Sequence, residues 1–354
     1  YVIIGEGEES LFSLVKYIES GRNFDEITID GCAYKSNGTK MIPKVSFIEN
    51  LDSIPFPARD LMPMEFYINR HTILYGLGKR RSASIITSRS CPKRCTFCSM
   101  YQSHGTVWRA RSAKNVFEEI KLLYEKYRIE ELFFNDDNLT FDKERMKELC
   151  ELIIRNGITL RWNTPNGISA QSLDSELAVL MKRSGCVNIC IGVEAGNDKV
   201  RNRIIKKGLS VETIRNTLNI CTKAGLPVVG FFILGIPGEN EDSFKDTIRM
   251  VKEMPFYMIA TSFFTPFPGT KLYEECLAKG YINKNHSKNI DKFNAPIVET
   301  PDFNKETLRK WEKMIYCEFI KSHFWKLVFL TVTKRNEFFK LEQIKRFIIE
   351  KFAF

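Results

Sequence analysis

Apolar runs and amphipathic stretches alternate along the middle of the chain. Runs with strand character occupy residues 84–89, 131–135, 159–163, 187–194, 228–234 and 259–265. Stretches with helical periodicity lie between them, at residues 113–127, 143–155, 172–184, 211–224 and 241–253. Successive βα-type units of this kind predict a parallel sheet with right-handed crossovers. We therefore expect an α/β fold, whose economical form is a (β/α)6 barrel, complete or partial.

Cap and turn residues support these boundaries. The N-cap candidates are Ser112, Asp142 and Ser210, and the closing glycines are Gly157, Gly185 and Gly225. Residues 187–191 and 231–234 are apolar on both faces of the predicted strands. This pattern is typical of parallel strands that helices cover on either side.

Polar and glycine residues gather where each predicted strand ends. They lie at residues 91–98, 135–138, 163–167, 192–196, 235–239 and 265–269. In β/α barrels the chemistry collects at the carboxyl ends of the strands. We therefore predict the functional site at this edge of the sheet.

The first of these clusters carries the most specific chemical signal. Cys91, Cys95 and Cys98 have C-x3-C-x2-C spacing just past a strand-like run. Three thiolates can hold three irons of a [4Fe–4S] cluster and leave the fourth iron without a protein ligand. An open coordination position is what separates catalytic from structural metal sites. The spacing thus predicts a cluster that binds and activates a small molecule.

A zinc site is the alternative interpretation of the same cysteines, with His104 as the fourth ligand. Zinc ligands usually come in pairs separated by a longer loop. The compact run, with Phe97 between its last two thiols, favours the iron–sulfur cluster. Colour distinguishes the two, because an anaerobic iron–sulfur protein is brown and a zinc protein is colourless.

The cysteines and the βα units together resemble the radical S-adenosylmethionine (SAM) superfamily over residues 82–275. In that family the open iron chelates the amino and carboxylate groups of SAM. An electron from the cluster then cleaves the sulfonium and yields methionine and a 5′-deoxyadenosyl radical. The resemblance implies Cys91, Cys95 and Cys98 as metal ligands. It also implies a [4Fe–4S] cluster and SAM as cofactors.

Glu194 and Phe97 are predicted to contact the cofactor. Glu194 ends a buried strand in a Gly-x-Glu-x-Gly setting, where its carboxylate can accept hydrogen bonds from a ribose diol. The alternative for Glu194 is a salt bridge to Arg203 or Lys206. Phe97 is assigned to the cofactor site by its place within the cysteine run.

Two aspartates and two glycines complete the predicted cofactor site. Asp136 and Asp137 are candidates for the SAM amine or for a polar substrate, and their alternative role is to cap the next helix. Gly230 and Gly235 permit close approach of the backbone to a ligand. In the superfamily this fifth-strand region lies against the adenine.

Four residues near the cysteine run have two interpretations each. Arg109 and Arg111 precede a helix and either hold a carboxylate or fix the loop geometry. Tyr101 and Trp108 either pack over the cluster or belong to the core.

The N-terminal part resembles the junction after the cobalamin-binding domain in the cobalamin-type subgroup of the superfamily. Residues 5–8 (Gly-Glu-Gly-Glu) and 51–59 (Leu-Asp-Ser-Ile-Pro-Phe-Pro-Ala-Arg) carry this resemblance. The subgroup includes methyltransferases and the anaerobic magnesium-protoporphyrin monomethyl ester cyclase. The cobalt-binding Asp-x-His-x-x-Gly motif is absent from the sequence. We expect a piece of a longer protein, whose full-length form uses cobalamin.

This resemblance suggests three parts. Residues 1–70 are predicted to be the end of a Rossmann-like cobalamin domain plus a Pro-rich linker. Residues 71–275 form the barrel, and residues 276–354 form a basic, mostly helical C-terminal segment. The expected reaction is radical methylation or carbon-skeleton modification of a small molecule.

Charge and cysteine usage bear on partners and location. The formal net charge is +10, and much of the excess lies in residues 305–351, where aromatic residues are interleaved. Such a tail suits a partner domain or peripheral contact with an acidic membrane. It also permits an alternative function, a basic zinc-stabilised module that binds nucleic acid. The cysteines outside the run lie mostly in apolar segments, which favours a reducing cytoplasm. The expected protein partner is a reductant such as flavodoxin or ferredoxin.

Overall fold

The structure is a computed structural model, and it describes residues 1–21, 27–36, 38–69, 80–282 and 295–332. Side chains of the last helix are described as far as His323. The end of the basic tail, residues 333–354, lies outside the described residues. None of the described helices is long and apolar enough to cross a membrane.

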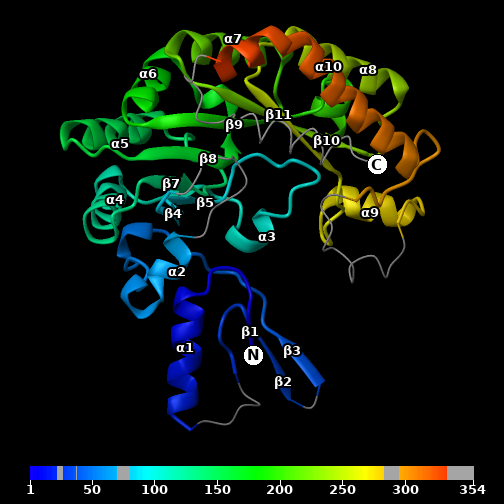
Figure 1. The fold of residues 1–354 in the computed structure, drawn as a ribbon. Coiled ribbons are helices and arrows are strands. Elements are labelled where there is room, and N and C mark those ends of the chain that lie inside the picture. The colour runs from blue at the N-terminus through cyan, green and yellow to red at the C-terminus, as the bar shows by residue number, and fades with distance from the viewer. Residues whose placement is uncertain (22–26, 37, 70–79, 283–294, 333–354) are drawn as a thin grey trace.

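A six-stranded sheet forms the centre of the molecule (Figure 1). Its strands are β4 (Ser82–Ile85), β7 (Glu131–Phe134), β8 (Arg161–Ile168), β9 (Cys186–Glu194), β10 (Val228–Leu234) and β11 (Met258–Phe263), in that spatial order. Every neighbouring pair is parallel. β4 and β11 are the two edges, so the sheet is a partial barrel and the predicted fold class is confirmed.

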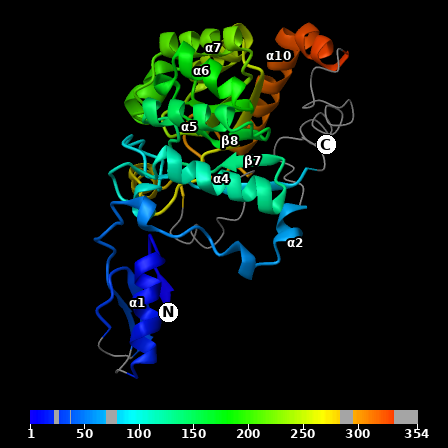
Figure 2. The same cartoon turned by 90° about the vertical axis from the view of Figure 1, so that its left-hand side faces the viewer.

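Helices cover the outer side of this sheet (Figures 1 and 2). They are α4 (Ala113–Tyr127), α5 (Lys143–Arg155), α6 (Ser175–Arg183), α7 (Val211–Ala224), α8 (Glu241–Glu253) and α10 (Lys305–Val332). Their apolar faces and the outer face of the strands form one continuous core, with Trp162, Phe232 and Phe244 among its largest buried side chains. Burial of this core is the main stabilising contribution to the fold.

Helix boundaries follow the predicted caps. Ser112, Asp142 and Ser210 each accept a hydrogen bond from the backbone N–H three residues later. The helix predicted at 172–184 is shorter, because Asp174 caps it and residues 170–172 form a separate 3-10 turn. The third strand is longer than predicted. Its polar residues 163–167, expected in a loop, belong to β8.

The strand predicted at 84–89 is divided in two. β4 ends at Ile85, and the chain then leaves the parallel sheet. β5 (Ser88–Arg89) pairs with β6 (Arg109–Ala110) in an antiparallel ribbon. This ribbon joins the two ends of the cysteine loop, which also contains α3 (Tyr101–His104).

A small lobe precedes the barrel and lies below it in both views (Figures 1 and 2). It contains helix α1 (Glu8–Glu19) and an antiparallel sheet of β1 (Val2–Ile3), β2 (Cys32–Ser36) and β3 (Gly38–Met41). Its own core holds Leu14, Ile27, Cys32 and Tyr34. The linker then passes along the barrel edge to α2 (Met64–Ile68). The boundaries at residues 70 and 275 stay predictions.

Gly185, between α6 and β9, offers a test of this packing. Its φ is +102°, and a Cβ there would collide with the carbonyl oxygen of Leu160. Gly185→Ala combines left-handed strain with a backbone clash, so we expect the free energy of unfolding to fall by about 3 kcal/mol in denaturant titrations.

Gly157 is the matched control. Its φ is +63°, and no heavy atom of the described residues lies within 4 Å of a Cβ built there. Gly157→Ala is expected to cost about 1 kcal/mol, from backbone strain alone. Equal losses in the two variants would contradict the clash.

Candidate functional site

A cavity of about 260 Å³ opens at the carboxyl ends of the strands. Cys91, Cys95 and Cys98 all line it, as the sequence predicts for residues at this edge. Its other walls come from the ends of several strands, including Asp137 after β7 and Glu194 at the end of β9. The parallel sheet thus brings chain-distant polar groups to the three thiols.

The cysteine loop is fixed at several points. Ser90 has a φ of +73°, its N–H donates to Asp137 at 3.2 Å, and its hydroxyl donates to the Gly105 carbonyl at 3.0 Å. Thr96 donates its N–H to Ile205 O at 2.9 Å and its hydroxyl to Ile204 O at 2.8 Å. These hydrogen bonds hold the backbone of the loop that carries the three thiols.

Burial shapes the chemistry of these thiols. It raises the pKa of Cys95 to about 11, against the opposing effect of the Lys207 ammonium. Burial also raises the pKa of Cys98. A thiol becomes a thiolate when it binds a metal, so a cationic cluster supplies the charge that keeps these buried sulfurs ionised. The donor set fits an iron–sulfur cluster.

The zinc interpretation requires His104 close to the three cysteines, and His104 is not among the residues that line the cavity. His104, the proposed fourth ligand, instead lies with its Nδ1 3.6 Å from Glu6. In a cubane cluster each thiolate binds a different iron.

Glu194 lies at a break in the strand register. Its φ is +70°, and the pairing of β10 with β9 shifts there, so that Phe232 opposes Glu194 and Val193 is skipped. The bulge turns the carboxylate into the cavity. Its partner is neither predicted residue but Lys207, whose Nζ lies 2.6 Å from Oε1.

Lys207 is a residue that the sequence analysis missed. It follows a π-helical turn, Lys199–Ile204, and lies close enough to Cys91 and Cys95 for their charges to interact. A π-turn is a frequent feature of functional sites. The sequence shows only two adjacent lysines, and which one reaches the cavity depends on that turn.

Asn138 lies in the predicted polar cluster 135–138 but was given no role of its own. The side-chain amide of Asn138 donates to the Cys91 sulfur at 3.7 Å, and its backbone carbonyl accepts from the Trp108 indole at 3.0 Å. Trp108 packs against Phe141 and does not line the cavity. Tyr101 bonds to the Gly269 carbonyl. The prediction that these two aromatic residues cover the cluster is not supported.

The two predicted aspartates have different positions. Asp137 lines the cavity as predicted. Asp136 is fully buried and accepts from Thr87 N at 3.1 Å, Thr87 Oγ1 at 2.7 Å and Ser88 Oγ at 2.6 Å. It anchors the turn between β4 and β5 and is not among the residues that line the cavity. Its assignment to the cofactor therefore finds no support.

Gly230 and Gly235 serve packing and turn geometry. A Cβ on Gly230 would meet the rings of Phe256 and Phe232. Gly235 has a φ of +89° and donates its N–H to the buried carboxylate of Glu239 at 2.7 Å. Neither glycine lines the cavity, whereas Phe231 and the predicted Phe97 do.

One buried carboxylate ties the N-terminal lobe to the cysteine loop. Glu6 is 3% exposed and accepts from both terminal nitrogens of Arg109, at 2.6 and 3.0 Å. Arg89 lies 3.3 Å from it, and the Ile48 N–H donates at 3.1 Å. Arg89 and Arg109 face each other across the β5–β6 ribbon where the cysteine loop begins and ends, so Glu6 holds the base of the loop. Arg109 thus fixes loop geometry.

The chain was compared with protein-family models and with curated proteins. The family model described as the radical SAM superfamily matches residues 85–251. An uncharacterized methyltransferase of Pyrococcus horikoshii is 30% identical over 322 residues, which are 90% of this chain and 66% of that protein. The cytidylyl-2-hydroxyethylphosphonate methyltransferase of Streptomyces wedmorensis is 29% identical, over 85% of this chain and 61% of that protein.

One further relative and one solved structure are similar to this chain. The anaerobic magnesium-protoporphyrin IX monomethyl ester cyclase of Rubrivivax gelatinosus is 25% identical, over 77% of this chain and 48% of that protein. The chain thus spans about half to two thirds of the length of these relatives. Among solved structures, the radical SAM methyltransferase TsrM from Kitasatospora setae, with cobalamin and a [4Fe–4S] cluster bound, has a TM-score of 0.66 and 16% identity. That match covers 89% of this chain and 67% of TsrM, and it shows the fold.

Glu6→Gln tests the attachment of the loop. Burial alone would raise the pKa of Glu6, but hydrogen bonds from His104 and Arg109 outweigh it and hold the pKa at about 2. Loss of the charge leaves Arg89 and Arg109 poorly compensated, so we expect the free energy of unfolding at pH 7 to fall by about 3 kcal/mol.

The pH dependence has a defined sign. Because the pKa of Glu6 is lower in the folded chain, its stabilisation is present above about pH 4.5 and fades as the pH falls toward 2. The difference in the free energy of unfolding between wild type and Glu6→Gln should therefore become smaller as the pH falls over that range. Glu19→Gln, which breaks an exposed pair with Lys16, should cost less than about 1 kcal/mol. If this difference in the free energy of unfolding did not change with pH, the ionised Glu6 carboxylate would not be its cause.

Proposed function

The chain belongs to the radical SAM superfamily, and on that premise we propose that it is the catalytic core of an enzyme that reductively cleaves SAM. The observation that supports this most is the meeting of three thiols with Glu194 and Lys207 in one cavity. Cys91, Cys95 and Cys98 would hold a [4Fe–4S] cluster. When bound, the cluster and SAM supply one-electron cleavage of the sulfonium.

Each side chain of the cavity has a proposed role. The Glu194 carboxylate accepts hydrogen bonds from the ribose diol of SAM, and Lys207 holds that carboxylate in place. Lys207 also places a positive charge near the thiolates. Asp137 is suited to the SAM amine, because it lines the cavity beside the cysteine loop. The Asn138 amide donates to the Cys91 sulfur and so supports one cluster ligand.

The proposed reaction is radical methylation or carbon-skeleton modification of a small molecule. The methyltransferases and the cyclase among the relatives support this class. A low-potential reductant of the flavodoxin or ferredoxin type is the partner that such chemistry requires. We keep the cytoplasm as the proposed location and peripheral membrane contact through the basic tail as a proposed interaction.

A longer protein with a cobalamin domain is the proposed context for residues 1–70. Helix α1 presents Leu11, Phe12, Val15 and Ile18 to solvent, with Phe12 64% exposed. β1 is an edge strand of the small sheet. An apolar helix face beside an open strand edge is typical of an interaction surface. These features support packing of this lobe against more polypeptide.

The alternative of a zinc-stabilised nucleic-acid module finds no support. Neither the matching family model nor the relatives named above are nucleic-acid-binding modules.

Cys95→Ala tests the cluster assignment. We expect the anaerobically reconstituted variant to lose most of its iron and all formation of 5′-deoxyadenosine from SAM with dithionite, because two thiolates do not hold the cluster. Cys317→Ala, which changes a thiol outside the cavity, is the control and should behave as wild type. Normal cleavage in Cys95→Ala would refute the proposed function.

Glu194→Gln tests the SAM contact. A charged hydrogen bond is worth about 1.5–3 kcal/mol, so the Kd for SAM should rise about tenfold or more in equilibrium dialysis. Cluster content should stay unchanged. Glu212→Gln, on the exposed start of α7, is the matched control. An unaltered Kd in Glu194→Gln would remove this residue from the site.

A further inference from the structure

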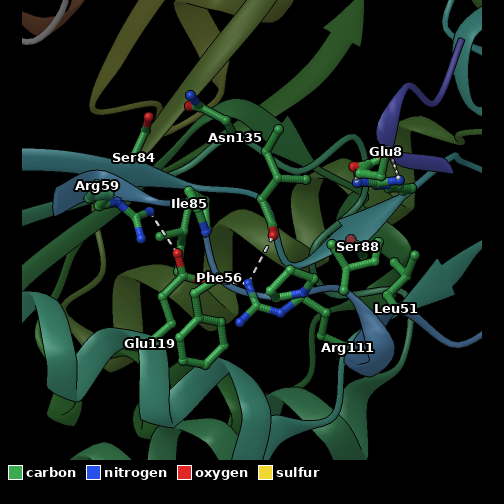
Figure 3. Close-up of a pocket in the computed structure, with 15 residues that line it drawn as sticks. Glu8, Leu51, Phe56, Arg59, Ser84, Ile85, Ser88, Arg111, Glu119 and Asn135 are labelled. Carbon is green, nitrogen blue, oxygen red and sulfur yellow. Dashed lines mark hydrogen bonds and ion pairs between the residues drawn. The ribbon is translucent and has the colours of Figure 1, made fainter. Parts of the chain in front are cut away.

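A second cavity, of about 370 Å³, lies at the free edge of β4 (Figure 3). It is bounded by the Pro-rich linker, by the end of β4 and by the first half of α4. None of the roles proposed above uses it. Its volume is within the range of small-molecule sites.

One side of this cavity is apolar. Leu51, Ile54, Phe56 and Pro57 come from the linker, and Ile86 is the first residue after β4. The Ile86 side chain is 51% exposed. An isoleucine left open to a concave surface is an apolar contact available to a ligand.

The opposite side carries an excess of positive charge. Arg59 and Arg111 both pair with the single carboxylate of Glu119, Arg59 at 2.6 Å. The third lining arginine, Arg89, is matched by Glu8 and Glu6. Two guanidinium groups on one buried carboxylate leave one charge uncompensated. In Figure 3 the Arg59 side chain points at Glu119, and Phe56 lies beside Arg111, whose guanidinium is 5.1 Å from the ring centre.

Arg59 also has a donor to spare. It is 9% exposed, and its Nη1 is buried with no hydrogen-bond acceptor among the described residues. Such a donor carries a desolvation cost of about 1–3 kcal/mol until an acceptor reaches it. An anionic oxygen beside Arg59 and Arg111 would compensate the excess charge.

One hydrogen bond links the linings of the two cavities. Asn135 lines the second cavity, and its carbonyl accepts from the Asn166 amide at 2.8 Å. Asn166 lines the cavity that contains the cysteines. Ser88 and Arg89 of the second cavity lead directly into the cysteine loop. The Asn135–Asn166 contact therefore separates a molecule held in the second cavity from the proposed SAM site.

We propose that the second cavity binds an oxyanion group, carboxylate or phosphate, carried on an apolar body. The oxyanion pairs with Arg59 and Arg111, and the body packs on Phe56 and Ile86. Resting on the proposed function, this molecule is the substrate, held by a part remote from the reacting carbon. Arg59 is then a specificity residue.

Calorimetric titration of the reconstituted chain with three probes tests the site. Benzoate and phenyl phosphate carry the oxyanion, and benzyl alcohol has a similar ring without charge. We expect the better of the two anions to bind at least tenfold more tightly than benzyl alcohol, and the tighter one identifies the oxyanion class. Equal binding of all three probes, or no binding of either anion, overturns the proposal.

Two variants locate the binding. Arg59→Gln should lower the affinity for the preferred anion at least tenfold. Ile86→Trp, which fills the cavity without breaking an ion pair, should lower it by a similar factor and serves as the test if Arg59→Gln fails to fold. Arg249→Gln, on the exposed side of α8, should change nothing. Unchanged affinity in Ile86→Trp would overturn the proposal.

A SAM arm separates this inference from the proposed function. The anion and SAM should bind together, each leaving the Kd of the other within about twofold. Displacement of the anion by SAM would place it in the first cavity and overturn the inference. If SAM is cleaved but the anion does not bind, only this inference fails. If the anion binds but SAM is not cleaved, the proposed function fails.

Discussion

Parallel pairing of the six strands is the constraint on which the rest of this structure depends. Because every strand runs the same way, all their carboxyl ends lie at one edge. Residues as distant in the chain as Cys91 and Lys207 therefore meet in one cavity. The outer helices stabilise the register by burying the opposite face of the sheet. The polar site is a consequence of that register, and it would not form on an antiparallel sheet with the same residues.

Buried carboxylates then attach the accessory segments to this edge. Glu6 forms ion pairs with Arg89 and Arg109, and Glu119 forms ion pairs with Arg59 and Arg111. The first carboxylate joins the N-terminal lobe to the cysteine loop, and the second joins the linker to α4. Arg109 lies in β6 and Arg111 follows that strand directly. This short segment after the cysteine loop therefore contacts both Glu6 and Glu119. The loop is thus braced from two sides, which limits its freedom before a cluster binds.

The sequence predicted elements well wherever local signals were strong. Helices α4, α5, α7 and α8 and strand β10 have the predicted bounds, because caps and apolar periodicity agree there.

The site was harder to predict. The three cysteines, Phe97, Asp137 and Glu194 do line the cavity, but Asp136 turns into the core to hold Thr87 and Ser88. Adjacent residues after a strand face opposite ways, and only the tertiary fold decides which one faces the site. Lys207 depends on a π-turn that no local pattern announced, and Gly230 proved to make room for the Phe256 ring.

The central claim is that three protein thiolates leave one iron of the cluster free for SAM. Mössbauer spectroscopy of the chain reconstituted with iron-57 tests it most directly. The account predicts that SAM changes the isomer shift of a single iron site and leaves the other sites unaltered, because only that iron lacks a thiolate. A spectrum of equivalent, fully ligated irons that does not respond to SAM would contradict the account.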